Sequence, residues 1–211
     1  MSARLAAALV LLASPAMAQG ERAARLAERA HQDREIVYFL KAPETHAFEL
    51  YHDVTQTEGA ERYLNVVRAG STVQDPKTVV LDTGESLPVE TLRGEAIRKA
   101  GLDIGEPVRP DSEVVVIRFP KVALGQTLRL QMSETYTDAG RYKLEGDELV
   151  FDRSFGRPRN AVVLPAGYAL TNSSIPTTVS ETEDGRIRLD FTNPRPDEIA
   201  VLITARKRRA K

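Results

Sequence analysis

Histidines are the scarcest groups here that could bind a metal or transfer a proton, and the 211-residue sequence has three of them. His46 and His52 share one side of an extended strand, but the spacing of about 3.3 Å per residue puts them roughly 20 Å apart. One metal ion cannot reach both. His31 lies in a separate segment rich in Ala, Arg and Glu. We therefore expect no metal and no other cofactor, and interpret His52 as a partly buried residue on an apolar strand face.

Short motifs of several common enzyme classes are absent from the sequence. Gly-x-Ser-x-Gly, which presents the nucleophile of α/β hydrolases, does not occur. Neither does Gly-x-Gly-x-x-Gly or the phosphate-binding Gly-x-x-x-x-Gly-Lys. The sequence also has no cysteine, which excludes thiolate chemistry and disulfides. These absences favour a non-catalytic protein.

One segment suggests an enzyme instead. In residues 79–86 an apolar stretch leads into Asp82-Thr83-Gly84, which resembles the active-site signature of retroviral-type and pepsin-like aspartic proteases. The resemblance implies a homodimer in which Asp82 of each subunit shares a proton and activates a water molecule. The simpler interpretation is a polar turn in which Gly84 supplies a positive φ. We favour the turn and keep a homodimeric aspartic peptidase as the alternative.

A loop with two arginines beside an aromatic residue is the candidate binding site. Phe155, Arg157 and Arg159 are close in sequence, and Tyr168 follows Pro165-Ala166-Gly167. Guanidinium groups bind carboxylates and phosphates with parallel hydrogen bonds, and aromatic rings add apolar contact. We take Phe155, Arg157, Arg159 and Tyr168 as the candidate binding residues. The favoured alternative is a solvated loop whose arginines pair with local acids.

A single carboxylate interrupts an apolar series. Glu134 falls between Met132 and Tyr136, at positions where every second residue is otherwise apolar. A buried carboxylate is costly unless it is paired, so a functional acid is one interpretation. The favoured one is that the strand has left the core by residue 134.

Alternating hydropathy predicts the elements that must position these residues, because successive side chains of a strand point to opposite faces. Expected strands cover 36–40, 48–54, 63–67, 78–81, 113–119, 128–136, 187–191 and 199–204. Turn residues at 138–140, 145–147 and 184–185 connect strand-like stretches at hairpin distance. One stripe of apolar residues, with Pro88 before it and Gly101 after it, predicts a short helix over 89–100. The fold class is therefore all-β and mainly antiparallel, a two-layer β-sandwich of one body or two lobes.

The domain boundaries follow from changes in composition. Residues 1–18 have one basic residue, an apolar run over 5–13 and Ala16-Met17-Ala18, the pattern of a cleaved signal peptide. Residues 19–34 form a helical or disordered leader. We expect a β-rich lobe over 35–102, a connection over 103–112, a second lobe over 113–205 and a basic tail over 206–211. The protein is then periplasmic or secreted, and its apolar run is too short to span a membrane.

Charge and composition limit the partners. The 29 basic and 30 acidic residues leave a net charge of −1, so no global field attracts nucleic acid. The basic tail could contact anionic membranes weakly, although a solubilising tail is favoured. The sequence thus predicts an exported, non-catalytic module of the bacterial cell envelope. We expect it to bind a protein, a peptide or a surface polymer.

Overall fold

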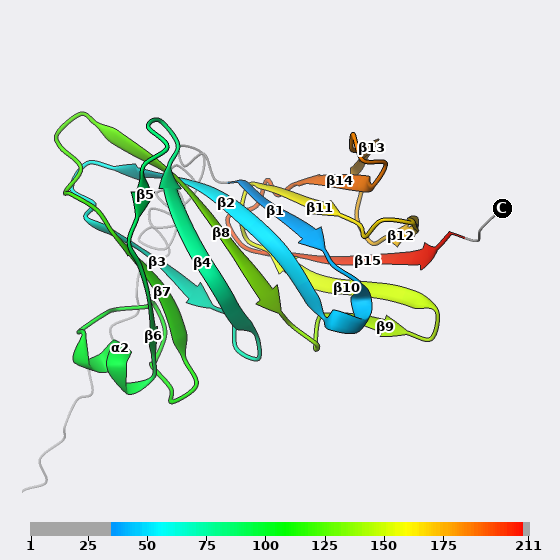
Figure 1. Ribbon diagram of the computed structural model, residues 1–211, viewed down its shortest axis with the longest axis horizontal. Coiled ribbons are helices and arrows are strands. Elements are labelled where there is room, and N and C mark those ends of the chain that lie inside the picture. The colour runs from blue at the N-terminus through cyan, green and yellow to red at the C-terminus, as the bar shows by residue number, and fades with distance from the viewer. Residues whose placement is uncertain (1–34, 209–211) are drawn as a thin grey trace, which may run out of the picture.

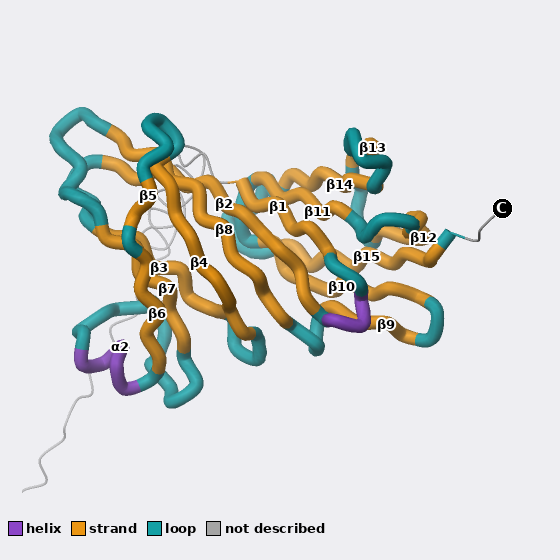
Figure 2. Tube along the Cα trace, in the orientation of Figure 1, coloured by secondary structure: helices purple, strands orange, loops and turns teal. Residues whose placement is uncertain are grey.

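A computed structural model of the protein describes residues 35–208, which form three β-sheets (Figures 1 and 2). The predicted signal peptide and leader lie outside the described residues. The largest sheet, here called the long sheet, has the order β13-β14-β11-β1-β2-β8-β4-β5. Its strands are β1 (Glu35–Leu40), β2 (Ala47–Thr57), β4 (Thr72–Val80), β5 (Ser86–Leu87), β8 (Thr127–Thr137), β11 (Arg159–Val163), β13 (Thr178–Glu181) and β14 (Ile187–Thr192). Its strands pair antiparallel except β1 and β11, which are parallel.

Two smaller antiparallel sheets complete the sandwich. The four-stranded sheet has the order β12-β15-β10-β9, and the three-stranded sheet has the order β3-β7-β6. Their strands are β3 (Arg62–Val67), β6 (Val89–Arg93), β7 (Glu113–Arg118), β9 (Tyr142–Glu145), β10 (Glu148–Phe155), β12 (Tyr168–Ser173) and β15 (Ile199–Lys207). Figure 1 shows the smaller sheets at opposite ends of the long sheet. The all-β, mainly antiparallel sandwich predicted from the sequence is confirmed.

The core lies between the long sheet and both smaller sheets. Phe48 of β2, Ile117 of β7 and Phe151 of β10 belong to one buried cluster, although they come from three different sheets. The rings of Phe48 and Phe151 meet edge to face with centroids 5.8 Å apart. Alternation within the strands produces this arrangement, since every second residue of β2, β8 and β10 is buried. The smaller sheets therefore cover the same face of the long sheet and leave a seam between them.

The predicted helix over 89–100 is wrong in its first half. Val89–Arg93 is strand β6, paired with β7, and only Glu95–Lys99 forms a helix, α2. Gly94 separates them with a φ of 44°. A Cβ there would lie 2.6 Å from the carbonyl oxygen of Pro110, so this position accepts only glycine without a shift of the backbone.

Strand pairing crosses the expected boundary between the lobes. Residues 103–112 connect α2 to β7, and β7 then pairs with β6 on the other side of that connection. In the long sheet, β2 pairs with β8 along eleven residues. The two-lobe division therefore has no counterpart in the strand pairing of residues 35–208. At the C-terminus, β15 continues to Lys207, so the expected basic tail starts inside a strand.

Two short helical segments accompany the strands. The 3₁₀-helix η1 (Pro43–Thr45) connects β1 to β2. Helix α2 places Ile97 on the outer face of β7, where Val114 and Val116 form a second cluster with it. Both faces of β7 are thus buried, which explains its unbroken apolar sequence. No helix among the described residues is long and apolar enough to cross a membrane.

Candidate binding site

The seam between the smaller sheets contains a polar pocket of about 290 Å³. Its walls come from both layers of the sandwich and include six polar residues used below. They are His52 (β2), Asn65 (β3), Glu134 (β8), Arg153 (β10), Arg157 (the β10–β11 connection) and Asn160 (β11). Arg68 and Glu198 also line the pocket and form an ion pair of 3.2 Å with side chains 31% and 54% exposed. The exposed pair marks the mouth, and the six residues named above, all buried except the half-buried Arg157, form the floor.

The floor is built around the carboxylate of Glu134. His52 and Glu134 are both at inward-facing positions of neighbouring strands, and their side chains are almost fully buried. His52 Nε2 lies 3.1 Å from Glu134 Oε1, and Asn65 Nδ2 donates to the same oxygen at 2.9 Å. The sequence-based preference for Glu134 outside the core is wrong. The strand stays in the core, and hydrogen bonds offset the cost of burying the carboxyl group.

Burial shifts both groups towards their neutral forms. It raises the pKa of Glu134 to about 7, a rise that the Asn65 hydrogen bond and the charges of nearby arginines oppose. Burial also lowers the pKa of His52 well below its ordinary value, and the positive charge of Arg157 lowers it further. At neutral pH the imidazole is therefore uncharged, and Glu134 is divided between its two protonation states.

Arg157 brings the main positive charge to this floor. Its Nη2 nitrogen donates to the hydroxyl of Tyr63 at 3.3 Å. Burial by itself would lower the pKa of Arg157, but the tyrosines Tyr63 and Tyr38 and the carboxylate of Glu134 raise it. The guanidinium group is thus permanently charged and acts on both His52 and Glu134.

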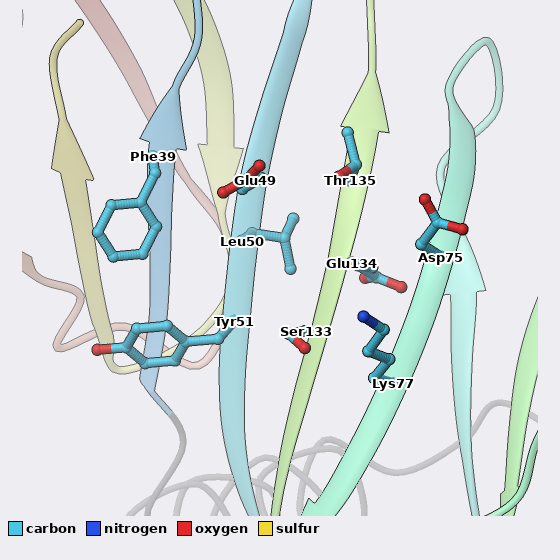
Figure 3. A pocket seen from close by; sticks show the side chains of 9 residues that line it. All are labelled: Phe39, Glu49, Leu50, Tyr51, Asp75, Lys77, Ser133, Glu134 and Thr135. Carbon is cyan, nitrogen blue, oxygen red and sulfur yellow. The ribbon is translucent and has the colours of Figure 1, made fainter. Parts of the chain in front are cut away.

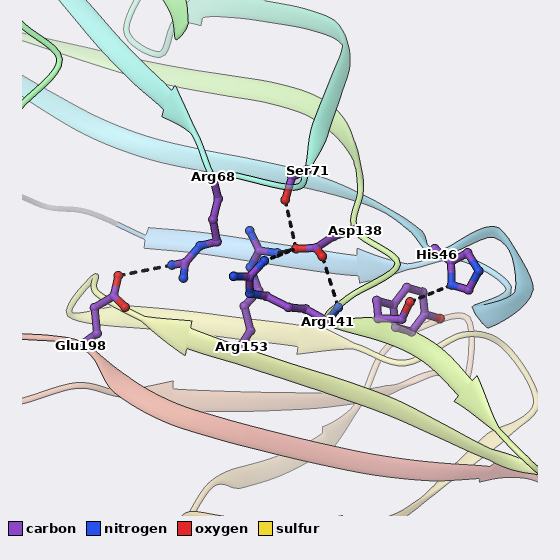
Figure 4. Close-up of polar contacts among 8 residues, drawn as sticks. His46, Arg68, Ser71, Asp138, Arg141, Arg153 and Glu198 are labelled. Atoms are coloured by element: carbon purple, nitrogen blue, oxygen red, sulfur yellow. Dashed lines mark hydrogen bonds and ion pairs between the residues drawn. The ribbon is translucent and has the colours of Figure 1, made fainter. Parts of the chain in front are cut away.

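Within the pocket floor, Arg153 is held by a buried ion pair. Its Nη1 nitrogen lies 3.1 Å from Asp138 Oδ2, and both side chains are more than nine-tenths buried. Ser71 and Arg141 donate to the same carboxylate at 3.0 and 3.3 Å (Figure 4). The Arg153 guanidinium lies over the ring of Phe48, 4.9 Å from its centroid. This geometry fixes Arg153 against the wall of the pocket.

Four residues that line the pocket each carry a buried polar atom without a hydrogen-bond partner within residues 35–208. These atoms are His52 Nδ1, Glu134 Oε2, Arg153 Nε and Asn160 Oδ1. An unpaired buried polar atom costs about 1–3 kcal/mol, so native proteins rarely leave several together. Four such atoms on the lining residues of one pocket indicate a region that polar molecules could complete.

The four residues predicted to bind do not come together in the structure. Phe155 is 1% exposed and stacks on Tyr38 in the core, and Tyr168 is also buried. Phe155 pairs with Ile199 and Tyr168 with Lys207, positions about 27 Å apart along β15. Arg159 is exposed on the outer face of the long sheet, and Arg157 alone lines the polar pocket.

Asp82 lies in the turn between β4 and β5, at the surface. The Arg129 side chain donates to its carboxylate at 2.5 and 3.1 Å and thereby lowers the pKa of Asp82. The backbone N–H of Glu85 donates to Thr83 Oγ1, and Gly84 has a φ of 74°. This is the geometry of the favoured polar turn. The aspartic peptidase stays a prediction, and its chemistry would need a proton-sharing carboxylate where Asp82 is held ionised.

A second, shallower pocket of about 400 Å³ lies on the outer face of the long sheet (Figure 3). The rings of Phe39 and Tyr51 lie along one side, with centroids 5.9 Å apart, and Lys77 lies across from them on β4. Within residues 35–208, Glu134 is the residue of this pocket's lining with a buried unpaired atom, and it occupies an inward-facing position of β8. The inner pocket is therefore the stronger candidate.

Sequence reasoning missed the floor of the pocket because it judged each polar residue alone. His52 and Glu134 each occupy an apolar position of an alternating strand. Two polar residues at apolar positions of paired strands are the sequence signal that could have revealed the site. Asn65 and Arg153 gave the same signal in β3 and β10. No group of three or more His, Asp or Glu side chains in residues 35–208 is arranged to hold a metal ion.

Comparison with known protein families finds no match, and neither does comparison with curated proteins. Among solved structures, the chain is similar to an M1 zinc metallopeptidase from Deinococcus radiodurans, with 13% identity and a TM-score of 0.45. That similarity covers 82% of this chain and 41% of the other. An aminopeptidase N family protein from Idiomarina loihiensis is similar at 11% identity and a TM-score of 0.44, over 81% of this chain and 29% of the other.

The chain thus spans less than half the length of the solved structures that it resembles. A likeness this distant carries no argument about activity. The fold and the pocket by themselves define the class, which is an all-β sandwich with a polar pocket between its layers.

Proposed function

We propose that this protein is an exported, non-catalytic binding module of the bacterial cell envelope, and that the polar pocket receives part of its protein, peptide or polymer ligand. The observation that carries the proposal is that four of the residues lining one pocket have a buried polar atom without a partner within the described residues. The signal-peptide pattern of residues 1–18 supports export. The exposed mouth at Arg68 and Glu198 gives a ligand access from solvent.

The arrangement of the polar groups favours binding over catalysis. Nucleophilic catalysis needs a nucleophile bonded to a base that is itself oriented by a third group. Here the base, His52, is bonded to Glu134. Ser154, the serine among the lining residues, alternates along β10 with Arg153 and Phe155, so its side chain lies on the other face of the strand. Recognition requires only fixed donors and acceptors, which the pocket provides.

The test is to fill the pocket and compare the partners that the protein recovers. In Ile36→Phe, a residue of the pocket wall gains volume without adding charge. Ile187→Phe is the matched control, because Ile187 is a half-buried residue of β14 outside the pocket. Each mature protein would be immobilised, exposed to envelope extract and washed, and the bound molecules measured by quantitative mass spectrometry.

We expect Ile36→Phe to lose a set of partners that the parent and Ile187→Phe retain. Thermal melts would establish that both variants are folded. Identical recovery by all three folded proteins would mean that the pocket takes no part in recognition.

A further inference from the structure

We propose that the polar pocket binds a carboxylate group, with Arg157 as its ionic partner, next to a hydrogen-bond donor of the same ligand. The inference rests on the pocket being the binding site proposed above. A free 2-hydroxy acid and the C-terminal residue of a peptide share this chemistry, since each places a hydroxyl or an amide N–H beside a carboxylate.

Within the described part of the chain, two of the three arginines around the pocket are paired with a carboxylate, and the third is not. Of its three arginines, Arg68 pairs with Glu198 at 3.2 Å and Arg153 pairs with Asp138 at 3.1 Å. Arg157 has no carboxylate within ion-pair distance among residues 35–208. Arg157 is half-buried, and a guanidinium group that loses part of its hydration is stabilised when an anion accompanies it.

Glu134 is the carboxyl group that could neutralise Arg157, but its position limits it. Its Oε1 oxygen already receives the hydrogen bond of Asn65 and faces His52. Glu134 affects Arg157 only across a distance longer than an ion pair. Its carboxyl group is partly protonated at neutral pH, because burial raises its pKa to about 7. The pocket therefore retains positive charge.

Several hydrogen-bond donors and acceptors of the pocket residues are unused within residues 35–208. A guanidinium group has five N–H donors, and Arg157 uses one on Tyr63. Arg153 Nε is a further buried donor without a partner. Carboxylate oxygens accept several hydrogen bonds and match the fork of a guanidinium group, so one ligand carboxylate can use these donors.

Two of the three remaining unpaired atoms define the group next to the carboxylate. Asn160 Oδ1 is an acceptor, and Glu134 Oε2 is an acceptor in its ionised form. A hydroxyl or amide N–H on the ligand would satisfy one of them. The pocket volume of about 290 Å³ suits a single residue or a small acid, with the rest of a longer ligand leaving past Arg68 and Glu198.

The experiment measures binding of matched probes to the mature full-length protein by isothermal titration calorimetry, with amide NMR shifts locating the site. The probes are N-acetyl-trialanine with a free carboxylate, the same peptide with a C-terminal amide, and lactate. We expect the amidated peptide to bind at least tenfold more weakly than the free acid. Peptide affinity well above that of lactate would identify a peptide C-terminus as the source, and the reverse would identify a small acid.

Variants of the pocket test the role of Arg157. Arg157→Gln should weaken binding of the free acid at least tenfold. Arg157→Lys should keep part of the affinity, because it keeps the positive charge but loses the planar set of guanidinium donors. Arg118→Gln is the control, since it removes an exposed arginine whose nearest acid, Glu90, is 3.9 Å away. Glu134→Gln should strengthen binding of the free acid. This prediction can be tested even if the Arg157 variants do not fold.

Two results would overturn the inference in distinguishable ways. Equal binding of the acid and the amide in the pocket would reject the carboxylate while leaving the pocket as the binding site. If no probe shifted any resonance of the pocket, both the carboxylate and the pocket's part in the proposed function would be wrong.

Discussion

His52 and Glu134 contribute to stability with opposite dependence on pH, although they share one hydrogen bond. The pKa of Glu134 is raised from 4.5 to about 7, so the folded protein binds a proton there that the unfolded chain releases. Stability from this group is therefore lost as pH rises from about 4.5 to 7. The pKa of His52 lies well below 6.5, so the unfolded chain binds the extra proton and stability is lost as pH falls below 6.5.

Single variants should separate these two effects. We expect the free energy of unfolding of His52→Gln to fall more steeply with rising pH than that of the parent between pH 4.5 and 6.5. Glu134→Gln should change the slope in the opposite direction over the same range. Each change is at most about 1.4 kcal/mol per pH unit, the value for one proton. Urea unfolding of the three proteins at half-unit pH steps measures the slopes.

If both variants changed the slope of unfolding free energy against pH in the same direction relative to the parent, the two groups would not be buried in their neutral forms. The parent is the internal control, because in it the two contributions oppose each other between pH 4.5 and 6.5.

At the residue scale, the sequence could show which positions face inward but not which polar side chains meet there. His52 lies on an apolar, core-facing strand face as predicted, but it is almost fully buried and not partly buried. The prediction for Glu134 was outside the core, because a lone carboxylate is costly to bury. That cost is offset by Asn65, which comes from a different sheet. No local pattern could reveal a partner 69 residues away.

Among the elements, Gly94 determines where a strand ends and a helix begins. Val89 and Leu92 fit one helical stripe with Ile97, but the structure puts Val89 in the main core and Leu92 with Ile97 in the outer cluster. The positive φ of Gly94 turns the chain between them. Long alternating strands such as β2 and β8 could be predicted from sequence, because their period of two repeats several times.

Substitution of Gly94 by alanine should lower the free energy of unfolding by more than its unfavourable backbone conformation alone would. Gly94→Ala meets the Pro110 carbonyl oxygen at 2.6 Å, and its φ of 44° is unfavourable for alanine. Gly84→Ala is the matched control, with a φ of 74° and no atom within 4 Å of the added carbon. We expect Gly84→Ala to cost about 1–2 kcal/mol and Gly94→Ala at least about 1 kcal/mol more. Urea unfolding measures both, and equal losses would mean that the contact with Pro110 relaxes at no cost.

At the scale of the whole molecule, polar contacts must join the two layers of the sandwich near the seam that contains the pocket. Asp138 follows β8 of the long sheet, Arg153 belongs to β10 of the four-stranded sheet, and Ser71 precedes β4 (Figure 4). One buried carboxylate thus joins segments from both layers. The two-lobe prediction from the sequence could not anticipate this, because strand pairing and ion pairs between distant segments leave no trace in local hydropathy.

Removing that carboxylate should loosen the sandwich as a unit. Asp138→Ala leaves Arg153 buried without its anion, and breaking a buried pair in this way costs about 3–5 kcal/mol. Glu95→Ala is the control, because it removes an exposed acid that pairs with Arg98 within α2 and should cost less than about 1 kcal/mol. The double variant Asp138→Leu/Arg153→Met should recover part of the loss, since it leaves no unpaired charge. Chemical unfolding measures all three, and a loss in Asp138→Ala as small as that in Glu95→Ala would show that the layers hold together by apolar packing alone.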